Sequence, residues 1–338
     1  MFQHPSSKKP LAPLEGRRVL DLSCYLPGPW LTRVLCDLGA EVLKVEPPGG
    51  EGLRHLPPLQ DGVGKAYMAL NAGKEVIELD LKKPEERDSL LDRIPSFDVL
   101  VESYRPGKLA KLGLSMEELH TRNPRLVVCS VSGYGQSSQR AGHDLNYTAR
   151  AGTLGLFGPP DGPPQVPGVQ IADIGGALHG VIGVLAALME GSGRHLDISI
   201  ARSTLPFAVM ALAGDAGVRG RGMFTGGAAG CQVYETRDGG YMALAALEPH
   251  FFARFCELAG IPQCSPWTEE SIPALRETFL SRTRAEWIAL LDGEDVCCEP
   301  VLSRDEALAD TEVGADWQSW RGFSVLRASL GGPPPELG

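Results

Sequence analysis

The sequence lacks the cysteine spacing of a metal site or of a disulfide-rich scaffold. Its eight cysteines include no pair separated by two residues, and Cys297 and Cys298 are adjacent. This usage is typical of reduced thiols. A run of about 18 apolar residues and the layout of a secretory signal are also missing, and the formal net charge is -10. We therefore expect a cytoplasmic protein that binds no metal, no membrane and no nucleic acid.

Two nucleotide-binding motifs are absent as well. Gly62–Lys65 matches a P-loop only in part, because the upstream glycine is missing and Ala66 stands where Ser or Thr would bind magnesium. The turn after the first predicted strand carries Pro27-Gly28-Pro29 in place of G-x-G-x-x-G. Neither a P-loop nucleotide site nor a Rossmann dinucleotide site is predicted.

What the N-terminal part does contain is an alternation of short apolar runs with helical patterns. Strands are predicted at Arg18–Leu22, Glu41–Glu46, Val76–Leu79, Asp98–Val101, Leu126–Val131 and His195–Ile200. Helices are predicted at Pro29–Leu38, Lys83–Arg93, Met116–Thr121 and Ile174–Glu190. Strands that alternate with helices indicate an α/β fold with a Rossmann-like, mostly parallel sheet.

The pattern changes after a glycine-dense stretch at 214–230. Cys231–Glu235 and Tyr241–Ala246 flank a turn and predict an antiparallel hairpin, and helical patterns follow it. Because 338 residues exceed the ~250–300 at which single cores stop growing, two domains are expected. We predict a flexible arm (1–14), a large domain (15–213), a linker (214–230), a small α+β domain (231–308) and a C-terminal segment (309–338) that returns to the large domain.

Two segments carry residues suited to proton transfer. His143 lies in the polar stretch Ala141–Tyr147, and Asp173 precedes Gly175 and Gly176 at the start of an apolar helix. Histidine accepts or delivers protons near neutral pH, and burial can raise the pKa of an aspartate toward that range. Two bases on opposite sides of one carbon would racemise it. Each residue also has a structural interpretation, as a histidine that bonds a turn and as a helix N-cap.

Several motifs occur in the order of a known family. They are Leu22–Pro29, Leu38–Gly49, Arg105–Gly107, Ser132–Gln136, Ala141–Tyr147, Asp173–Gly176 and Leu247–Phe251. Together they resemble the class III CoA-transferase (CaiB/BaiF) superfamily, and specifically its α-methylacyl-CoA racemase branch. The resemblance spans roughly Leu14 to Ala307 and implies an interlocked dimer of ring-shaped subunits, with each active site shared between two chains.

The resemblance also implies roles for single residues. His143 and Asp173 are the two bases, and Glu248 is the partner that orients His143. Lys44, Arg105 and Lys74 are candidate contacts to the phosphates or the adenine of CoA, which is part of the substrate, so no separate cofactor is expected.

Elementary chemistry adds a prediction for the glycines. Unpaired N–H groups at a helix start favour negative charge. An N–H near Gly175 and Gly176 could therefore donate to the enolate oxygen of a thioester, which the two glycines would let approach closely.

Two other functions remain open at this stage. A CoA-transferase would use Asp173 as a nucleophile and, by the resemblance, would lack the Gly-His-Asp-Leu-Asn-Tyr signature that this chain has at 142–147. A homologue that only binds acyl-CoA is the other alternative. Only Ser137–Arg140 separate the glycine loop from Ala141, whereas the family that the chain resembles usually has about seven residues there.

Overall fold

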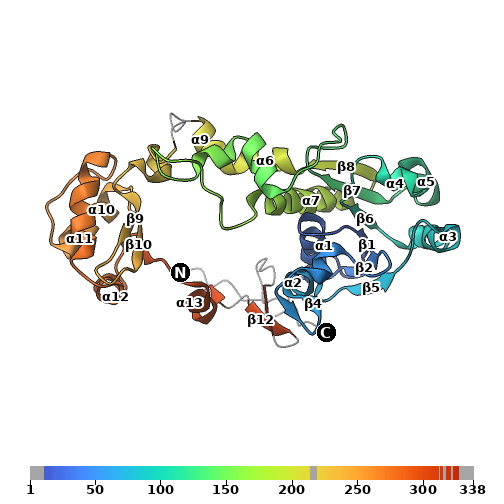
Figure 1. Ribbon diagram of the computed structural model, residues 1–338, viewed down its shortest axis with the longest axis horizontal. Helices are drawn as coiled ribbons and strands as arrows, with labels where there is room; N and C mark the ends of the chain where they lie inside the picture. Colours follow the sequence, from blue (N-terminus) through green and yellow to red (C-terminus); the bar gives the residue numbers. More distant parts are fainter. Residues whose placement is uncertain (1–10, 214–218, 312, 315–316, 321–322, 327–338) are drawn as a thin grey trace. The chain divides into compact units, whose positions relative to one another are not determined.

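The computed structural model describes residues 11–213, 219–311, 313–314, 317–320 and 323–326. The chain forms two compact units, whose elements are labelled in Figure 1: unit 1 is Met1–Ala151, Val169–Thr204 and Asp310–Gly338, and unit 2 is Gly152–Gly168 and Leu205–Ala309. Residues 152–168 and 205–213, which the sequence assigned to the large domain, thus belong to unit 2. Most of the predicted arm (1–10), part of the linker (214–218) and much of the C-terminal segment (327–338) lie outside the described residues.

Unit 1 is built on a six-stranded sheet in the order β5-β2-β1-β6-β7-β8, and every pairing in it is parallel. The strands are β1 (Arg18–Leu22), β2 (Glu41–Glu46), β5 (Glu75–Glu78), β6 (Val99–Glu102), β7 (Val127–Ser132) and β8 (Arg194–Ser199). The predicted parallel α/β sheet is therefore confirmed. The strand order reverses between β1 and β6, and such a switch point is where open α/β sheets bind ligands.

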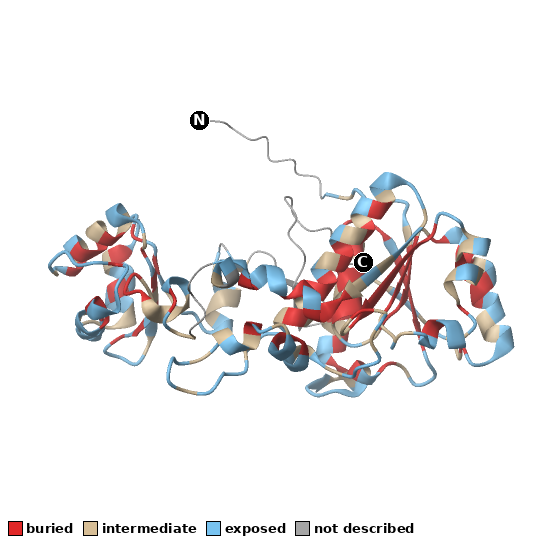
Figure 2. Ribbon diagram, turned by 90° about the horizontal axis from the view of Figure 1, so that it is seen from above, coloured by how far each residue is buried: buried red, intermediate tan, exposed pale blue. Residues whose placement is uncertain are grey.

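Helices cover both faces of this sheet because side chains alternate along each strand. Val99 and Val101 of β6 pack in the core cluster that contains α1 and α7, whereas Leu100 packs in the cluster that contains α3 and α5. Figure 2 shows the strands largely buried between these layers. The helices of unit 1 are α1 (Pro27–Asp37), α2 (Lys65–Asn71), α3 (Pro84–Arg93), α4 (Lys108–Lys111), α5 (Met116–Arg122), α6 (Asp144–Arg150), α7 (Ile171–Glu190) and α8 (Ile200–Ser203).

Helix α7 begins three residues earlier than the sequence predicted, so Asp173 lies inside its first turn. Among the described helices it alone is long and apolar enough to cross a membrane by length and composition, with a mean hydropathy of 1.8. One side of α7 packs against α1, β7 and β8. Another side exposes Leu178, Ile182 and Met189.

Unit 2 contains an antiparallel sheet in the order β11-β10-β9, which includes the predicted hairpin. Its elements are α9 (Val209–Ala213), β9 (Cys231–Glu235), β10 (Tyr241–Ala245), α10 (Pro249–Ala259), α11 (Ile272–Leu280), α12 (Arg284–Leu291), β11 (Cys298–Pro300) and α13 (Arg304–Ala309). Tyr234, Phe255, Phe279 and Trp287 form an aromatic core between sheet and helices.

Short elements complete both units. They are η1 (Gly52–His55), β3 (Leu59–Gln60), β4 (Val63–Gly64), η2 (Ile94–Ser96), η3 (Thr153–Leu156), η4 (Leu205–Ala208), η5 (Met223–Gly227), η6 (Glu269–Ser271), β12 (Trp317–Trp320) and β13 (Phe323–Leu326). The predicted interlocked ring-shaped dimer stays a prediction, since one chain is described.

Candidate active site

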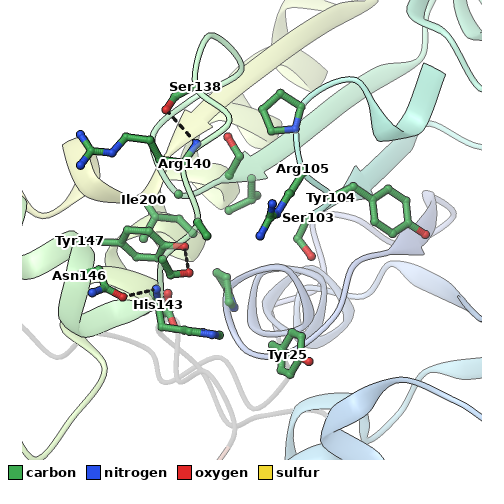
Figure 3. A pocket seen from close by; sticks show the side chains of 18 of the residues that line it. Tyr25, Ser103, Tyr104, Arg105, Ser138, Arg140, His143, Asn146, Tyr147 and Ile200 are labelled. Carbon is green, nitrogen blue, oxygen red and sulfur yellow. Dashed lines mark hydrogen bonds between the residues drawn. The ribbon is translucent and has the colours of Figure 1, made fainter. Parts of the chain in front are cut away.

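The candidate active site lies within unit 1, beyond the carboxyl ends of the parallel strands. A cavity of about 530 Å³ opens there. The segments that follow β1, β6, β7 and β8 line it together with residues at the starts of α6 and α7. Its lining includes Tyr25, Ser103, Arg105, His143 and Tyr147, which Figure 3 labels. Asp173 also lines it. The two predicted bases and one predicted CoA contact thus share a single cavity.

His143 is the residue immediately before α6, and the predicted signature itself fixes the turn that carries it. The Asn146 side-chain oxygen accepts a hydrogen bond from the His143 backbone N–H at 3.0 Å. The Tyr147 hydroxyl donates to the carbonyl oxygen of Gly142. Position 142 needs glycine, because an added Cβ would lie 2.7 Å from the Tyr147 ring. The imidazole itself does not cap α6 and remains exposed.

Asp173 is held at the start of α7 by a carboxylate from a different helix. One oxygen of Asp144 accepts hydrogen bonds from the backbone N–H groups of Ala172, at 2.7 Å, and of Asp173, at 3.1 Å. Burial, reinforced by the negative charge of Asp144, raises the pKa of Asp173 to about 7. A carboxyl group with this pKa exchanges protons readily near neutral pH.

The role of Asp144 could not be predicted from the sequence. As the first residue of α6, it can locally only cap its own helix or bond nearby backbone. Instead it caps a helix that begins 27 residues later, a contact that only the fold creates.

The structure differs from the prediction made for Gly175 and Gly176. The first four N–H groups of α7 all donate to acceptors inside the protein, two of them to Asp144. None of these four is left to donate to a thioester oxygen. Gly176 does permit a close approach, but to Ile200, because an added Cβ would lie 3.0 Å from the Ile200 side chain.

Arg105 follows β6 and is the predicted CoA contact that the structure leaves accessible. Its guanidinium reaches into the cavity beside Ser103 (Figure 3), and the residue is exposed. Burial and the negative charge of Asp173 raise the pKa of Tyr147 to about 12, although the positive charge of Arg105 acts to lower it. Arg105 is thus placed to bind a negatively charged part of a ligand.

Lys44 and Lys74 occupy a different environment from the one predicted. The side chains of both are 0% exposed. The Lys44 ammonium donates to the Ser23 carbonyl oxygen at 2.8 Å and lies 3.4 Å from Glu51, whereas Lys74 donates to Asp21 at 3.1 Å. A CoA phosphate therefore has no access to either ammonium here.

These buried charges support each other electrostatically. Burial lowers the pKa of Lys74 to about 8, against the opposing effect of the Asp21 charge. Burial would raise the pKa of Asp21, but the charges of Lys44 and Lys74 hold it well below its usual range. Both lysines therefore stabilise the loop after β1 from inside the protein.

Glu248 lies in unit 2, where it directly precedes α10. Its side chain makes no capping hydrogen bond to that helix. Burial, followed by the negative charge of Glu248, raises the pKa of the nearby Cys297 thiol. The predicted pairing of Glu248 with His143 stays a prediction.

A second cavity of about 290 Å³ adjoins the first and was not predicted. Cys24, Tyr25 and Tyr104 line both cavities. Apolar side chains from several strand ends form its walls, and Lys82 and Lys108 also line it. The Lys108 ammonium lies 4.4 Å from the centre of the Tyr104 ring. The sequence signal was present in Leu79–Lys82, where a lysine follows the end of a predicted strand by three residues.

Known proteins resemble this chain over nearly its whole length. A model of CoA-transferase family III matches residues 14–321. The chain is 31% identical over 328 residues to succinyl-CoA:glutarate CoA-transferase of Mus musculus, which covers 90% of this chain and 75% of that protein. It is 34% identical over 316 residues to alpha-methylacyl-CoA racemase of Mus musculus, with coverages of 87% and 79%.

A solved structure agrees with these sequence comparisons. A CAIB/BAIF family protein from Brucella suis superposes with a TM-score of 0.82 at 29% identity, over 96% of each chain. Transferases and racemases are similarly related to this chain in sequence. On the family match and these identities, the chain belongs to CoA-transferase family III.

Proposed function

We propose that the protein racemises or epimerises CoA thioesters of 2-methyl-branched acids by two-base proton transfer through an enolate. One observation carries this proposal: His143 and Asp173 line the same cavity from two separate segments. The raised pKa of Asp173, at about 7, supports it further, because a base and its conjugate acid are then both populated near neutral pH.

The residues of the cavity account for each proton. One base takes the α-proton, the C–H electron pair moves into the enolate, and negative charge develops on the thioester oxygen. The other base then delivers a proton to the opposite face of the same carbon. Asp173 serves one face and His143 the other, while the Arg105 guanidinium in the same cavity stabilises negative charge.

CoA binding fits the two adjoining cavities. The thioester must lie beside His143 and Asp173 in the first cavity, and CoA is long enough to continue past the shared residues into the second. There the apolar walls suit the adenine, and the cations Lys82 and Lys108 suit phosphate. This assignment replaces the buried Lys44 and Lys74 with accessible lysines.

A homodimer is part of this proposal. Leu178, Ile182 and Met189 lie along one exposed side of α7, and the side chain of Met189 is 89% exposed. Exposed apolar stripes of this kind mark surfaces that contact another protein. A second copy of the chain would cover this stripe and would bring a second Glu248 into the assembly.

CoA transfer is the second candidate, because transferases are similarly related to this chain. Ionised Asp173 would attack the thioester carbonyl, forming a mixed anhydride as the CoA thiolate leaves. CoA thiolate would then attack that anhydride to form an aspartyl-CoA thioester, as the acid leaves. His143 has no necessary part in this sequence.

The experiment follows one enantiomer of a 2-methylacyl-CoA in deuterated water and records deuterium incorporation and chirality together. Racemisation predicts exchange with loss of chirality, lost or confined to one face in His143→Ala and Asp173→Ala. His120→Gln is the matched control, since His120 contacts the Leu126 carbonyl oxygen and does not line the cavity.

The alternatives give different results in the same assay. CoA passing to an added free acid without α-exchange, together with borohydride reduction of a trapped Asp173 thioester, would establish transfer and overturn the proposal. Tight binding of the thioester with neither reaction would indicate a protein that only binds acyl-CoA.

A further inference from the structure

Tyr25 has a backbone conformation that bulky residues rarely adopt. Its φ is +64°, in the left-handed region that favours glycine. Among the described residues, the other non-glycine positions with positive φ are Asp61 and Cys297. A strained conformation persists only where the surrounding structure holds it, and such residues cluster at functional sites.

The loop around Tyr25 is held by three consecutive backbone hydrogen bonds to side chains. The N–H of Ser23 donates to Asp21 at 2.9 Å, and the N–H of Cys24 donates to the hydroxyl oxygen of Ser103 at 2.9 Å. The N–H of Tyr25 donates to the buried carboxylate of Glu51 at 2.7 Å. Because Glu51 also pairs with the buried Lys44, this network of buried charges holds the backbone of Tyr25 in place.

The side chain of Tyr25 is half exposed, which excludes core packing as the reason for its position. Its ring stands edge-on to the His143 imidazole, with the ring centres 6.4 Å apart and the planes at 83° (Figure 3). That geometry is within the range of favourable aromatic pairs. The tyrosine also lines both cavities, at the boundary between them.

Apart from Glu248, which is predicted to pair with it, the imidazole of His143 has little to fix its direction. Within the part of the chain that the structure describes, no hydrogen bond involves its side chain. The backbone N–H of His143 donates to the Asn146 side-chain oxygen, and the ring does not cap α6. A general base must keep its nitrogen within hydrogen-bond reach of the proton it transfers. The Tyr25 ring limits the rotation that would move it away.

We propose that Tyr25 is a positioning residue that holds the His143 imidazole toward the substrate α-carbon, an inference that rests on the proposed racemase function. The aromatic ring performs this role and the hydroxyl is not required. The left-handed backbone of Tyr25 is needed because it directs the ring across the boundary of the two cavities onto His143.

Because asparagine tolerates positive φ far better than tyrosine, the test separates positioning from stability. Tyr25→Asn removes the ring and relieves the backbone, so its melting temperature should equal or exceed that of the wild type. Tyr25→Phe keeps the ring and should keep the activity. Asp61→Gly is the matched control, because it relieves a positive φ in the β3–β4 turn, outside both cavities.

Exchange of the α-proton in deuterated water is measured separately for the two enantiomers. His143→Ala and Asp173→Ala first assign each face to its base. In Tyr25→Asn, exchange at the His143 face should fall on the order of tenfold to a hundredfold, as misplaced catalytic groups do. Exchange at the Asp173 face should change less than twofold.

Three outcomes would overturn the inference: unchanged exchange in Tyr25→Asn, an equal loss at both faces, or an equal loss in Tyr25→Phe. If Tyr25→Asn does not fold, Tyr25→Leu, which keeps apolar volume without a ring, takes its place with the same expected asymmetry. A wild-type protein without α-exchange would instead refute the proposed function, so the two failures are distinguishable.

Discussion

Replacing Asp144 by asparagine would test the electrostatic setting of Asp173 with little change in geometry. The amide oxygen can still accept the two N–H groups at the start of α7, while the negative charge is removed. Burial is the larger cause of the raised Asp173 pKa and the Asp144 charge the smaller. We therefore expect the pKa of Asp173 to fall by about one unit, a minor part of its displacement.

The sign of the effect on the rate follows from the proposed role of Asp173 as a base. It works ionised, so exchange at its face should rise with pH through about 7 in the wild type. In Asp144→Asn this rise should occur about one pH unit lower. At pH 6 about fivefold more of Asp173 is then ionised, and because the base is about threefold weaker, the net exchange should be roughly twofold faster than in the wild type. At pH 9 the weaker base should be about threefold slower, so the two profiles cross.

The assay is deuterium incorporation at the Asp173 face as a function of pH, under conditions that report kcat/KM. Asp144→Ala is the comparison that removes charge and hydrogen-bond acceptor together, and it should cost about 1 kcal/mol of stability. A pH profile of Asp144→Asn that coincides with the wild type would refute the electrostatic account of Asp173.

Three further predictions concern burial and CoA binding. Asp173→Asn should stabilise the fold at pH 8 by on the order of 2 kcal/mol but not at pH 4. The reason is that the pKa of Asp173 is raised to about 7 in the folded state, which costs stability as pH rises from about 4 to 7. Urea unfolding at both pH values tests this. Lys74→Met should lower the free energy of unfolding by about 3–5 kcal/mol at pH 7, and by less below pH 4, where Asp21 is protonated on unfolding. Weaker CoA binding with unchanged stability would instead support Lys74 as a CoA contact. Lys82→Ala should raise KM for the CoA thioester about tenfold with kcat unchanged, and equal KM values in titrations at low salt would remove Lys82 from the CoA site.

Local patterns predicted the parts of the fold that local forces determine. The strands around Leu20 and Leu100 follow from apolar runs buried on both faces, and they lie within a residue or two of where the sequence placed them. The start of α7 was misplaced because its capping group, Asp144, is distant in the chain. Lys44 and Lys74 were predicted as CoA contacts from the resemblance, and nothing local in the sequence shows that each lies beside a buried carboxylate.

The same difference between local patterns and distant contacts applies to the candidate site. His143 and Asp173 could be proposed from sequence because the motifs that carry them, at 141–147 and 173–176, resemble those of a known family. Tyr25 could not, since its left-handed φ depends not only on Asp21 of the preceding strand but also on acceptors contributed by Ser103 and Glu51 from two distant segments.

The hydrogen bonds of Asp144 have a consequence for how this scaffold tolerates insertions and deletions. Asp144 follows His143 directly in the chain and holds the backbone of Asp173, so a single side chain sets the spacing of the two proposed bases. The loops on either side, before Ala141 and between α6 and α7, can then change length without altering that spacing. The brevity of Ser137–Arg140 is therefore compatible with an intact pair of proposed bases.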